Sequence, residues 1–203
     1  MKNIAVLASG NVHKIKEFIE IMTDYEILSL KDIGFSSDID ENGKTLFENS
    51  LIKARAISEF LREKNLNYAV IADDSGLFCE GLNGLPGINS ARFSGIHGDD
   101  EANRQKLLKE LDKVDNRKAY FGCAVVMVNP DGSYYVGDGK TYGTILKEYA
   151  GDTSFGYDCI FQSDDLGVSF GLASSAEKNS VSHRKRAIMD LLKNIDEGRC
   201  NRK

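Results

Sequence analysis

The feature that most constrains this fold is the opening of the chain, where a short apolar run leads directly into a helical pattern. Residues 4–8 read Ile-Ala-Val-Leu-Ala, which is typical of a strand buried on both faces of a sheet. Residues 9–11 break the run. Apolar residues then recur at helical spacing from Val12 to Met22. The chain therefore begins with a strand, a turn and a helix.

Later segments predict further elements around the same sheet. We expect strands near residues 26–29, 68–72, 119–128, 133–142, 144–149 and 159–162, and helices over about 45–64, 99–113 and from 182 onward. Asn-Pro-Asp-Gly at 129–132 is a hairpin turn. Residues 75–98, with six glycines, are expected to form a long functional loop. Early strand–helix units and a later hairpin indicate an α/β fold with a mixed β-sheet flanked by helices. We expect residues 1–203 to form a single domain.

Composition narrows the range of functions. The 203 residues are 41% hydrophobic and 28% charged, as in ordinary globular proteins. The formal net charge of −5 gives no general basic field for DNA or RNA. No apolar run approaches the roughly 18 residues that span a bilayer. The four cysteines show no zinc spacing. We expect a cytoplasmic protein with no nucleic-acid or membrane partner.

The first candidate site is residues 9–14, Ser-Gly-Asn-Val-His-Lys. A strand end, a glycine and a helix start place free N–H groups and a positive helix end at one point, which suits an anion. Lys14 would add a full charge. The alternative is ordinary helix capping by Asn11 with a solvated lysine. A Walker loop is excluded, because its second glycine and its Gly-Lys-Ser/Thr ending are missing.

The second candidate is the carboxylate pair Asp73 and Asp74, where a buried strand runs into a glycine-rich segment. Adjacent acids repel unless a cation or hydrogen bonds compensate them, and Mg²⁺ takes one or two carboxylates readily. Turn formation by Asp-Ser-Gly is the alternative. Asp40 and Glu41 in the preceding acidic loop could supply another metal ligand. Glu48 is also explained by a capping box with Thr45.

Two later blocks suit a flat heterocycle. In residues 154–158 a glycine between Phe155 and a tyrosine permits an exposed ring, and Asp158 adds an acceptor; an aromatic anchor of the core is the alternative. His183 and Arg184 follow Ser182 at the start of a helix. Because positive side chains are unfavourable there, an anion or a carbonyl-rich ligand would offset them.

Six blocks, in order, resemble the inosine/xanthosine triphosphate pyrophosphatases. They are residues 9–14, 45–50, 72–77, 84–92, 155–158 and 177–184. The resemblance implies an elongated α/β fold of two lobes with the site in the cleft between them, and a homodimer. It also implies hydrolysis of ITP, dITP and XTP to the monophosphate and pyrophosphate. The departures are small: the family often has threonine at Ser9, alanine at Ser50 and proline at Cys159.

Our hypothesis assigns roles on this basis. Mg²⁺ is held by Asp74 with Glu41 or Asp40, and Asp74 or Asp73 activates water. Lys14 and Lys53 hold the phosphates. The predicted substrate contacts are Ser9, Gly10, Asn11, Lys14, Ser75, Phe155, Gly156, Tyr157, Asp158, Lys178, His183 and Arg184. Phe155 stacks on the base, and Asp158, Lys178, His183 and Arg184 contact its edge.

Two rival functions remain open at this point. One is a pyrophosphatase of the septum-inhibitor type that acts on modified pyrimidine nucleotides. The block around Phe155 and the pair His183 and Arg184 argue against it. The other is a non-catalytic module that binds nucleotides or RNA. The acid pair and the net charge of −5 argue against RNA binding.

Overall fold

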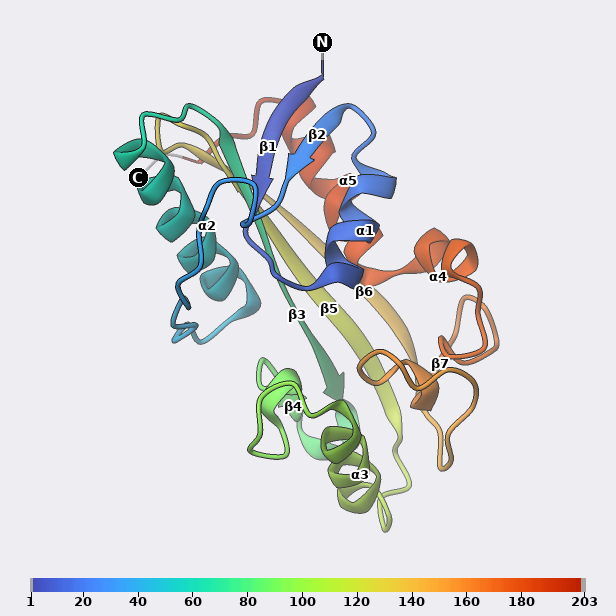
Figure 1. Cartoon of the computed structure of the whole chain (residues 1–203). Helices are drawn as coiled ribbons and strands as arrows, with labels where there is room; N and C mark the ends of the chain where they lie inside the picture. The colour runs from blue at the N-terminus through green and yellow to red at the C-terminus, as the bar shows by residue number, and fades with distance from the viewer. Residues whose placement is uncertain (1, 202–203) are drawn as a thin grey trace. The chain divides into compact units, whose positions relative to one another are not determined.

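The computed structural model describes residues 2–201 and shows a mixed β-sheet with helices against it (Figure 1). The predicted α/β class is therefore confirmed. The helices and strands are β1 (Asn3–Leu7), α1 (Val12–Ile21), β2 (Tyr25–Leu28), α2 (Leu46–Glu63), β3 (Ala69–Cys79), β4 (Pro86–Gly87), α3 (Asp100–Glu110), β5 (Lys118–Val128), β6 (Tyr134–Ile145), β7 (Phe161–Ser163), α4 (Ser175–Val181) and α5 (His183–Asp196). Short 3₁₀ turns lie at Glu80–Leu82, Ser90–Arg92 and Asp158–Ile160.

The strands of the described residues join one seven-stranded sheet. Its order is β2-β1-β3-β5-β6-β7, and β4 pairs with β3 outside this path. β1 is parallel to both β2 and β3, whereas β4 is antiparallel to β3 and β7 is antiparallel to β6. The parallel half follows from the strand–helix units at the start of the chain, and the later hairpin gives an antiparallel part.

The chain forms two compact units, each built from separate stretches of sequence. Unit 1 holds residues 2–74, Cys123–Gly139 and residues 185–201, and unit 2 holds Ser75–Gly122 and Lys140–Arg184. The long strands β3, β5 and β6 contribute residues to both units.

Unit 1 is a three-layer arrangement around the parallel strands. Along β1, Ala5 and Leu7 join a buried cluster with Phe18 of α1 and Ile188 of α5. Val6, which points the other way, joins a cluster with residues of α2. Figure 1 shows α1 and α5 on one side of these strands and α2 on the other. The apolar run at residues 4–8 is thus explained, because most of it is covered on both faces.

Unit 2 has its own core beneath α3. Leu107 and Leu111 at the end of that helix are fully buried against Leu77, Phe121 and other residues of the cluster. This core also includes Tyr157 and residues 159–161, so the segment after the predicted base-binding block is anchored in it.

The structure differs from the sequence-based expectation in three places. β3 continues to Cys79, so the acid pair lies within a strand and not at its end. Position 76 lies within this strand and requires glycine, because the carbonyl of Gly87 comes close to it. A Cβ there would lie 2.2 Å from that oxygen. β6 extends to Ile145 in place of a separate strand at 144–149. Helix α4 was not expected.

No helix within residues 2–201 is both long enough and apolar enough to cross a membrane.

Candidate functional site

A group of paired charges lies in unit 1 around the carboxylates Asp73 and Asp74. Nζ of Lys14 lies 3.1 Å from Oδ2 of Asp73, and the Asp73 side chain is fully buried. Lys14 is in the first turn of α1, directly after β1, and β1 is the parallel neighbour of β3. Because β1 lies next to β3, the helix that follows β1 brings Lys14 to the carboxylate of Asp73 on β3.

Asp74 is held by a residue of α2. The side-chain amide of Asn49 donates to Oδ2 of Asp74 at 2.9 Å, and Asn49 is itself 1% exposed. The other end of this amide accepts from the backbone N–H of Gly43 at 2.9 Å. Asn49 thus connects the acid pair to the loop that precedes α2.

Burial raises the pKa of the Asp74 carboxyl above its ordinary value, and the nearby Glu41 carboxylate raises it further. Lys53, the hydrogen bond from Asn49 and Lys14 act in the opposite direction. Desolvation is the largest of these effects, so the ionised form of Asp74 is disfavoured in the protein without a bound cation.

Lys53 and Glu41 form the second ion pair of this group. Nζ of Lys53 lies 3.1 Å from Oε2 of Glu41, and their side chains are 12% and 30% exposed. Lys53 follows Asn49 by four residues, so both project from the same face of α2. Asp40 is exposed, and its side chain makes no ion pair or hydrogen bond within the described part of the chain. The structure therefore brings Glu41, but not Asp40, into contact with this group.

The start of α1 is capped by its own side chain. Oδ1 of Asn11 accepts from the N–H groups of His13 and Lys14, and Oγ of Ser9 accepts from the N–H of Asn11. The capping alternative is thus what the structure shows, and a ligand would have to displace or supplement these contacts. Gly10 is exposed, and a Cβ there would meet nothing within 4 Å. The protein's own packing does not require glycine at this position.

The donor set of unit 1 fits a magnesium ion that is shared with phosphate. No three His, Cys, Asp or Glu side chains in residues 2–201 are grouped to hold a metal. Mg²⁺ usually takes one or two protein carboxylates and completes its shell with water and substrate phosphates. Asp74 and Glu41 offer such oxygens, and a divalent cation would favour the ionised form of Asp74 that burial disfavours.

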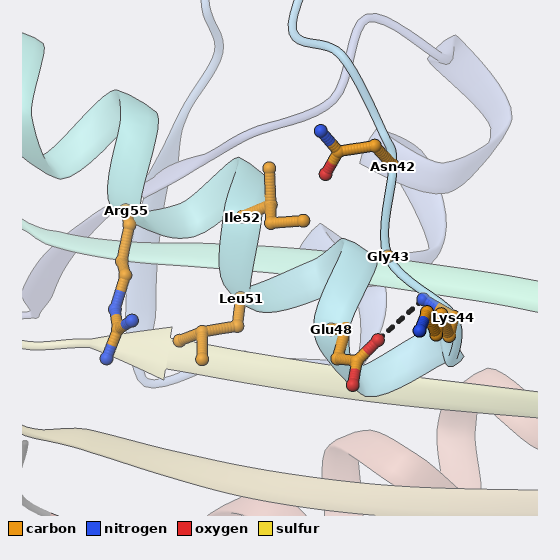
Figure 2. A pocket seen from close by; sticks show the side chains of 7 residues that line it. All are labelled: Asn42, Gly43, Lys44, Glu48, Leu51, Ile52 and Arg55. Atoms are coloured by element: carbon orange, nitrogen blue, oxygen red, sulfur yellow. Dashed lines mark hydrogen bonds between the residues drawn. The ribbon is translucent and has the colours of Figure 1, made fainter.

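A pocket of about 380 Å³ lies on another side of α2 in the same unit. Figure 2 shows side chains of α2 around it and the hydrogen bond from the N–H of Lys44 to the carboxylate of Glu48. Its lining residues are Asn42, Gly43, Lys44, Glu48, Leu51, Ile52 and Arg55. None of the predicted site residues lines it. Glu48 lines the pocket and also takes part in the start of α2, where its N–H donates to Oγ1 of Thr45.

Unit 2 brings together the predicted base-binding residues of two blocks. Nζ of Lys178, in α4, forms an ion pair with Oδ2 of Asp158. The same ammonium lies 4.7 Å from the centre of the Phe155 ring, a cation–π distance. Phe155 is half-buried, and Asp158 and Lys178 are largely buried. These three side chains form one cluster, although Lys178 lies 20 residues after Asp158 in the sequence.

His183 and Arg184 lie at the beginning of α5 and are almost completely buried. The His183 ring stacks on Phe121 with centroids 4.9 Å apart, and Nη2 of Arg184 donates to Oγ of Ser75 at 3.2 Å. Arg184 is 1% exposed, and a guanidinium is rarely buried unless it is bound to polar groups. Ser75, the residue after the acid pair, is therefore a contact of the base-binding block.

The remaining predicted contacts, Gly156 and Tyr157, help to determine the conformation of the loop. Gly156 has φ +51°, in the left-handed region that favours glycine. The hydroxyl of Tyr157 donates to the backbone oxygen of Ser90, and its ring is buried. Tyr157 is therefore the aromatic anchor in the core that was the alternative interpretation of this block. Phe155 stays partly exposed.

The sequence reasoning missed Asn49 as a site residue. Its position four residues before Lys53 on one helix face was the available signal. It also missed helix α4, which carries Lys178 into the cluster. The signal there was the capping box of Ser174 and Glu177, which the structure contains in full.

The fold and these two groups of side chains define an α/β protein with a lysine–carboxylate centre and an aromatic–cation cluster. A sequence model of the Ham1 family matches residues 5–194 of the chain. The chain belongs to the Ham1 family.

Individual relatives are similar over nearly the whole chain. A protein of Clostridium perfringens named dITP/XTP pyrophosphatase is 46% identical over 195 residues, which cover 94% of this chain and 96% of the relative. A Bacillus cereus protein with the same name is 41% identical over 203 residues, covering 97% and 96%. The resemblance to the inosine/xanthosine triphosphate pyrophosphatases is confirmed.

Solved structures agree with the fold. The Staphylococcus aureus Ham1 protein matches with a TM-score of 0.83 and 39% identity over 97% of this chain and 100% of that chain. A HAM1 protein from Coxiella burnetii matches with a TM-score of 0.84 and 32% identity over 96% and 99%.

Proposed function

We propose that this protein hydrolyses deaminated purine nucleoside triphosphates, namely ITP, dITP and XTP, to the monophosphate and pyrophosphate. The observation that carries the proposal is the unit 1 centre, in which two lysines are paired with buried or half-buried carboxylates beside Asp74. Relatives named dITP/XTP pyrophosphatase support the substrate class.

The triphosphate is expected to bind at Lys14 and Lys53. Each ammonium is now paired with a carboxylate, so phosphate oxygens would join or replace these partners. Gly10 would let a phosphate come close to the backbone, because glycine has no side chain and no other group lies within 4 Å of the Cβ position. The two lysines stabilise the charge that develops on the leaving pyrophosphate.

Asp74 and Glu41 are the residues that would hold Mg²⁺. When bound, the ion supplies Lewis-acid polarisation of a phosphoryl oxygen and neutralises charge in the transition state. Asn49 fixes the orientation of the Asp74 carboxylate. Asp40 has no part in this proposal.

A water molecule that Asp74 orients attacks the α-phosphorus in line with the leaving group, and its proton passes to the Asp74 carboxylate. Asp74 suits this role better than Asp73, because the Asp73 carboxylate is fully buried against Lys14. Asp73 holds Lys14 in position. The bond to the bridging oxygen breaks, and pyrophosphate leaves with the help of the lysines.

The purine base is assigned to the unit 2 cluster. Hypoxanthine and xanthine carry a carbonyl at position 6, which Arg184 and His183 can meet with donors, whereas the amine of adenine would face them donor to donor. An unmatched buried donor costs about 1–3 kcal/mol, so two give roughly a thousandfold preference. Phe155 and Lys178 flank the ring, and Asp158 holds Lys178.

We also propose that residues 1–203 form a single catalytic domain. We further propose that the enzyme acts as a homodimer in the cytoplasm, where the nucleotide pool is. Light scattering of the purified chain tests the homodimer: a mass near twice 22.4 kDa supports it, and a monomer mass contradicts it.

The test of function is a substrate panel with Mg²⁺, in which phosphate is detected with and without added inorganic pyrophosphatase. Turnover of ITP and XTP far above ATP, with phosphate seen only after pyrophosphatase is added, supports the proposal. Preference for a modified pyrimidine triphosphate would favour the septum-inhibitor type of enzyme. Binding of ITP without turnover would indicate a nucleotide-binding module.

A further inference from the structure

One helix of unit 2, α3, binds both the N–H and the carbonyl of Gly156 in the predicted base-binding loop. The carboxylate of Asp100, the first residue of α3, accepts the backbone N–H of Gly156 at 2.7 Å. Nη1 of Arg104, one turn later, donates to the carbonyl of the same glycine at 2.6 Å. Both backbone polar groups of Gly156 are therefore bound by charged side chains, and such hydrogen bonds are the stronger ones.

Arg104 is itself fixed. It is 4% exposed, its Nη2 donates to Glu101 at 2.8 Å, and its guanidinium lies 5.6 Å from the centre of the Tyr149 ring. The hydroxyl of Tyr149 in turn donates to Glu101 at 3.0 Å. A buried arginine bound in this way presents Nη1 to the loop in one orientation.

Gly156 separates two aromatic residues of the loop that have different surroundings. Phe155 before it is partly exposed and lies under the ammonium of Lys178, whereas Tyr157 after it is anchored in the core. A Cβ at Gly156 would meet nothing within 4 Å, so side-chain packing does not fix the backbone there. The bonds to Asp100 and Arg104 supply that constraint.

We propose that Asp100 and Arg104 are positioning residues for purine recognition, which act by fixing Gly156 and through it the Phe155 ring and the Asp158–Lys178 pair. Neither was expected from the sequence as a site residue. The inference rests on the proposed function, since it concerns the placement of the base and not the hydrolysis itself.

The first test compares Asp100→Ala, which removes the acceptor, with Asp100→Asn, whose side-chain oxygen can still accept from Gly156. Glu110→Gln is the matched control, since it removes one negative charge from an exposed position of the same helix. Steady-state hydrolysis of ITP and calorimetric binding of IMP without metal are measured for each. The wild type must first hydrolyse ITP; if it does not, the proposed function fails before this inference is reached.

We expect Asp100→Ala to raise the KM for ITP and weaken IMP binding by roughly tenfold, as loss of one charge-assisted hydrogen bond predicts. The kcat should change less than about threefold, because the phosphate centre is untouched. Asp100→Asn should recover most of the affinity, and Glu110→Gln should match the wild type. A purely structural role would lower the active fraction, and therefore kcat, with KM and IMP affinity unchanged, and that result would overturn the inference.

Arg104→Lys provides a second test should Asp100→Ala fail to fold. Lysine lacks the planar fork with which arginine binds the Gly156 carbonyl and Glu101 together, so it cannot hold that carbonyl in one orientation. We expect a raised KM for ITP with a retained circular dichroism spectrum. An unchanged KM and unchanged IMP affinity in a folded Arg104→Lys protein would contradict a positioning role.

Discussion

Asn49 ties Asp74 to the loop that carries Glu41: it donates to the Asp74 carboxylate at 2.9 Å and accepts from the N–H of Gly43 at the same distance. One buried amide thus links the two carboxylates that we assign to the metal. Their geometry depends on a residue that need not touch the substrate.

Asn49→Ala should therefore impair both stability and catalysis. It leaves the Gly43 N–H without its acceptor and removes a donor from Asp74, at a cost of about 1–3 kcal/mol in the free energy of unfolding. We expect kcat to fall by roughly ten- to a hundredfold as the metal ligands lose their arrangement. Urea unfolding and ITP kinetics check this. Glu63→Gln, at an exposed position of the same helix, is the control, and equal kinetics for the two variants would contradict the assignment.

Asp74→Asn should abolish turnover while the protein stays folded. Asparagine has nearly the same shape and can still accept from Asn49, but it cannot act as an anionic metal ligand or base. Pyrophosphate release from ITP should fall below detection, with an unchanged circular dichroism spectrum. Retained activity would remove Asp74 from its proposed role.

The same variant tests the effect of burial on the Asp74 carboxyl. Because the folded pKa lies above the ordinary value near 3.8, the folded state retains the Asp74 proton more strongly than the unfolded state does. The stability from this carboxyl is complete below about 3.8 and is lost as pH rises through the folded pKa. In metal-free buffer the unfolding free energy of wild type minus Asp74→Asn should therefore decrease from acid to neutral pH. An increase over that range would contradict the direction of the shift.

Lys14→Met should destabilise the protein, because it leaves the fully buried Asp73 carboxylate without its lysine. Breaking such a pair costs on the order of 3 kcal/mol. Adding Asp73→Asn should restore part of this loss, and the double-mutant cycle gives the coupling energy. Activity should stay low in Lys14→Met and in the double variant, since phosphate binding needs the lysine. Additive stability changes would show that the pair is not coupled.

Gly10→Ala should separate ligand approach from folding. A Cβ at Gly10 meets nothing within 4 Å, so we expect almost no change in melting temperature but a KM for ITP raised roughly tenfold by the obstructed phosphate. Gly76→Ala is the contrasting case. Its Cβ would lie 2.2 Å from the Gly87 oxygen, and the overpacking should cost about 1–3 kcal/mol in stability. A Gly10→Ala enzyme with the wild-type KM would exclude a close phosphate at this turn.

The opening of the fold could be predicted from sequence because its signals are local. The run at 4–8 alternates between two buried faces, and Asn11 supplies the cap of α1 from its own position. The extension of β3 could not be predicted in this way. The segment Asp-Ser-Gly that ends at Gly76 is typical of a turn. A glycine inside β3 is explained by the close approach of Gly87, which belongs to another strand.

The candidate site shows the same division. Lys14, Asp74, Lys53 and Arg184 were predicted as candidates from residue type and motif order, but the side chains that they contact were not predicted. The Lys14–Asp73 pair depends on β1 lying next to β3, and the bond from Arg104 to Gly156 joins positions 52 residues apart. Such contacts follow from topology, which local patterns do not specify. Asp40 and Glu41 are neighbours of the same charge, and only the ion pair with Lys53 distinguishes them.

The most direct test of the central claim is a crystal structure of the Asp74→Asn protein with ITP and Mg²⁺. The account predicts the triphosphate oxygens against Lys14 and Lys53, with Mg²⁺ beside position 74 and Glu41. A nucleotide whose phosphates contact neither lysine would contradict it.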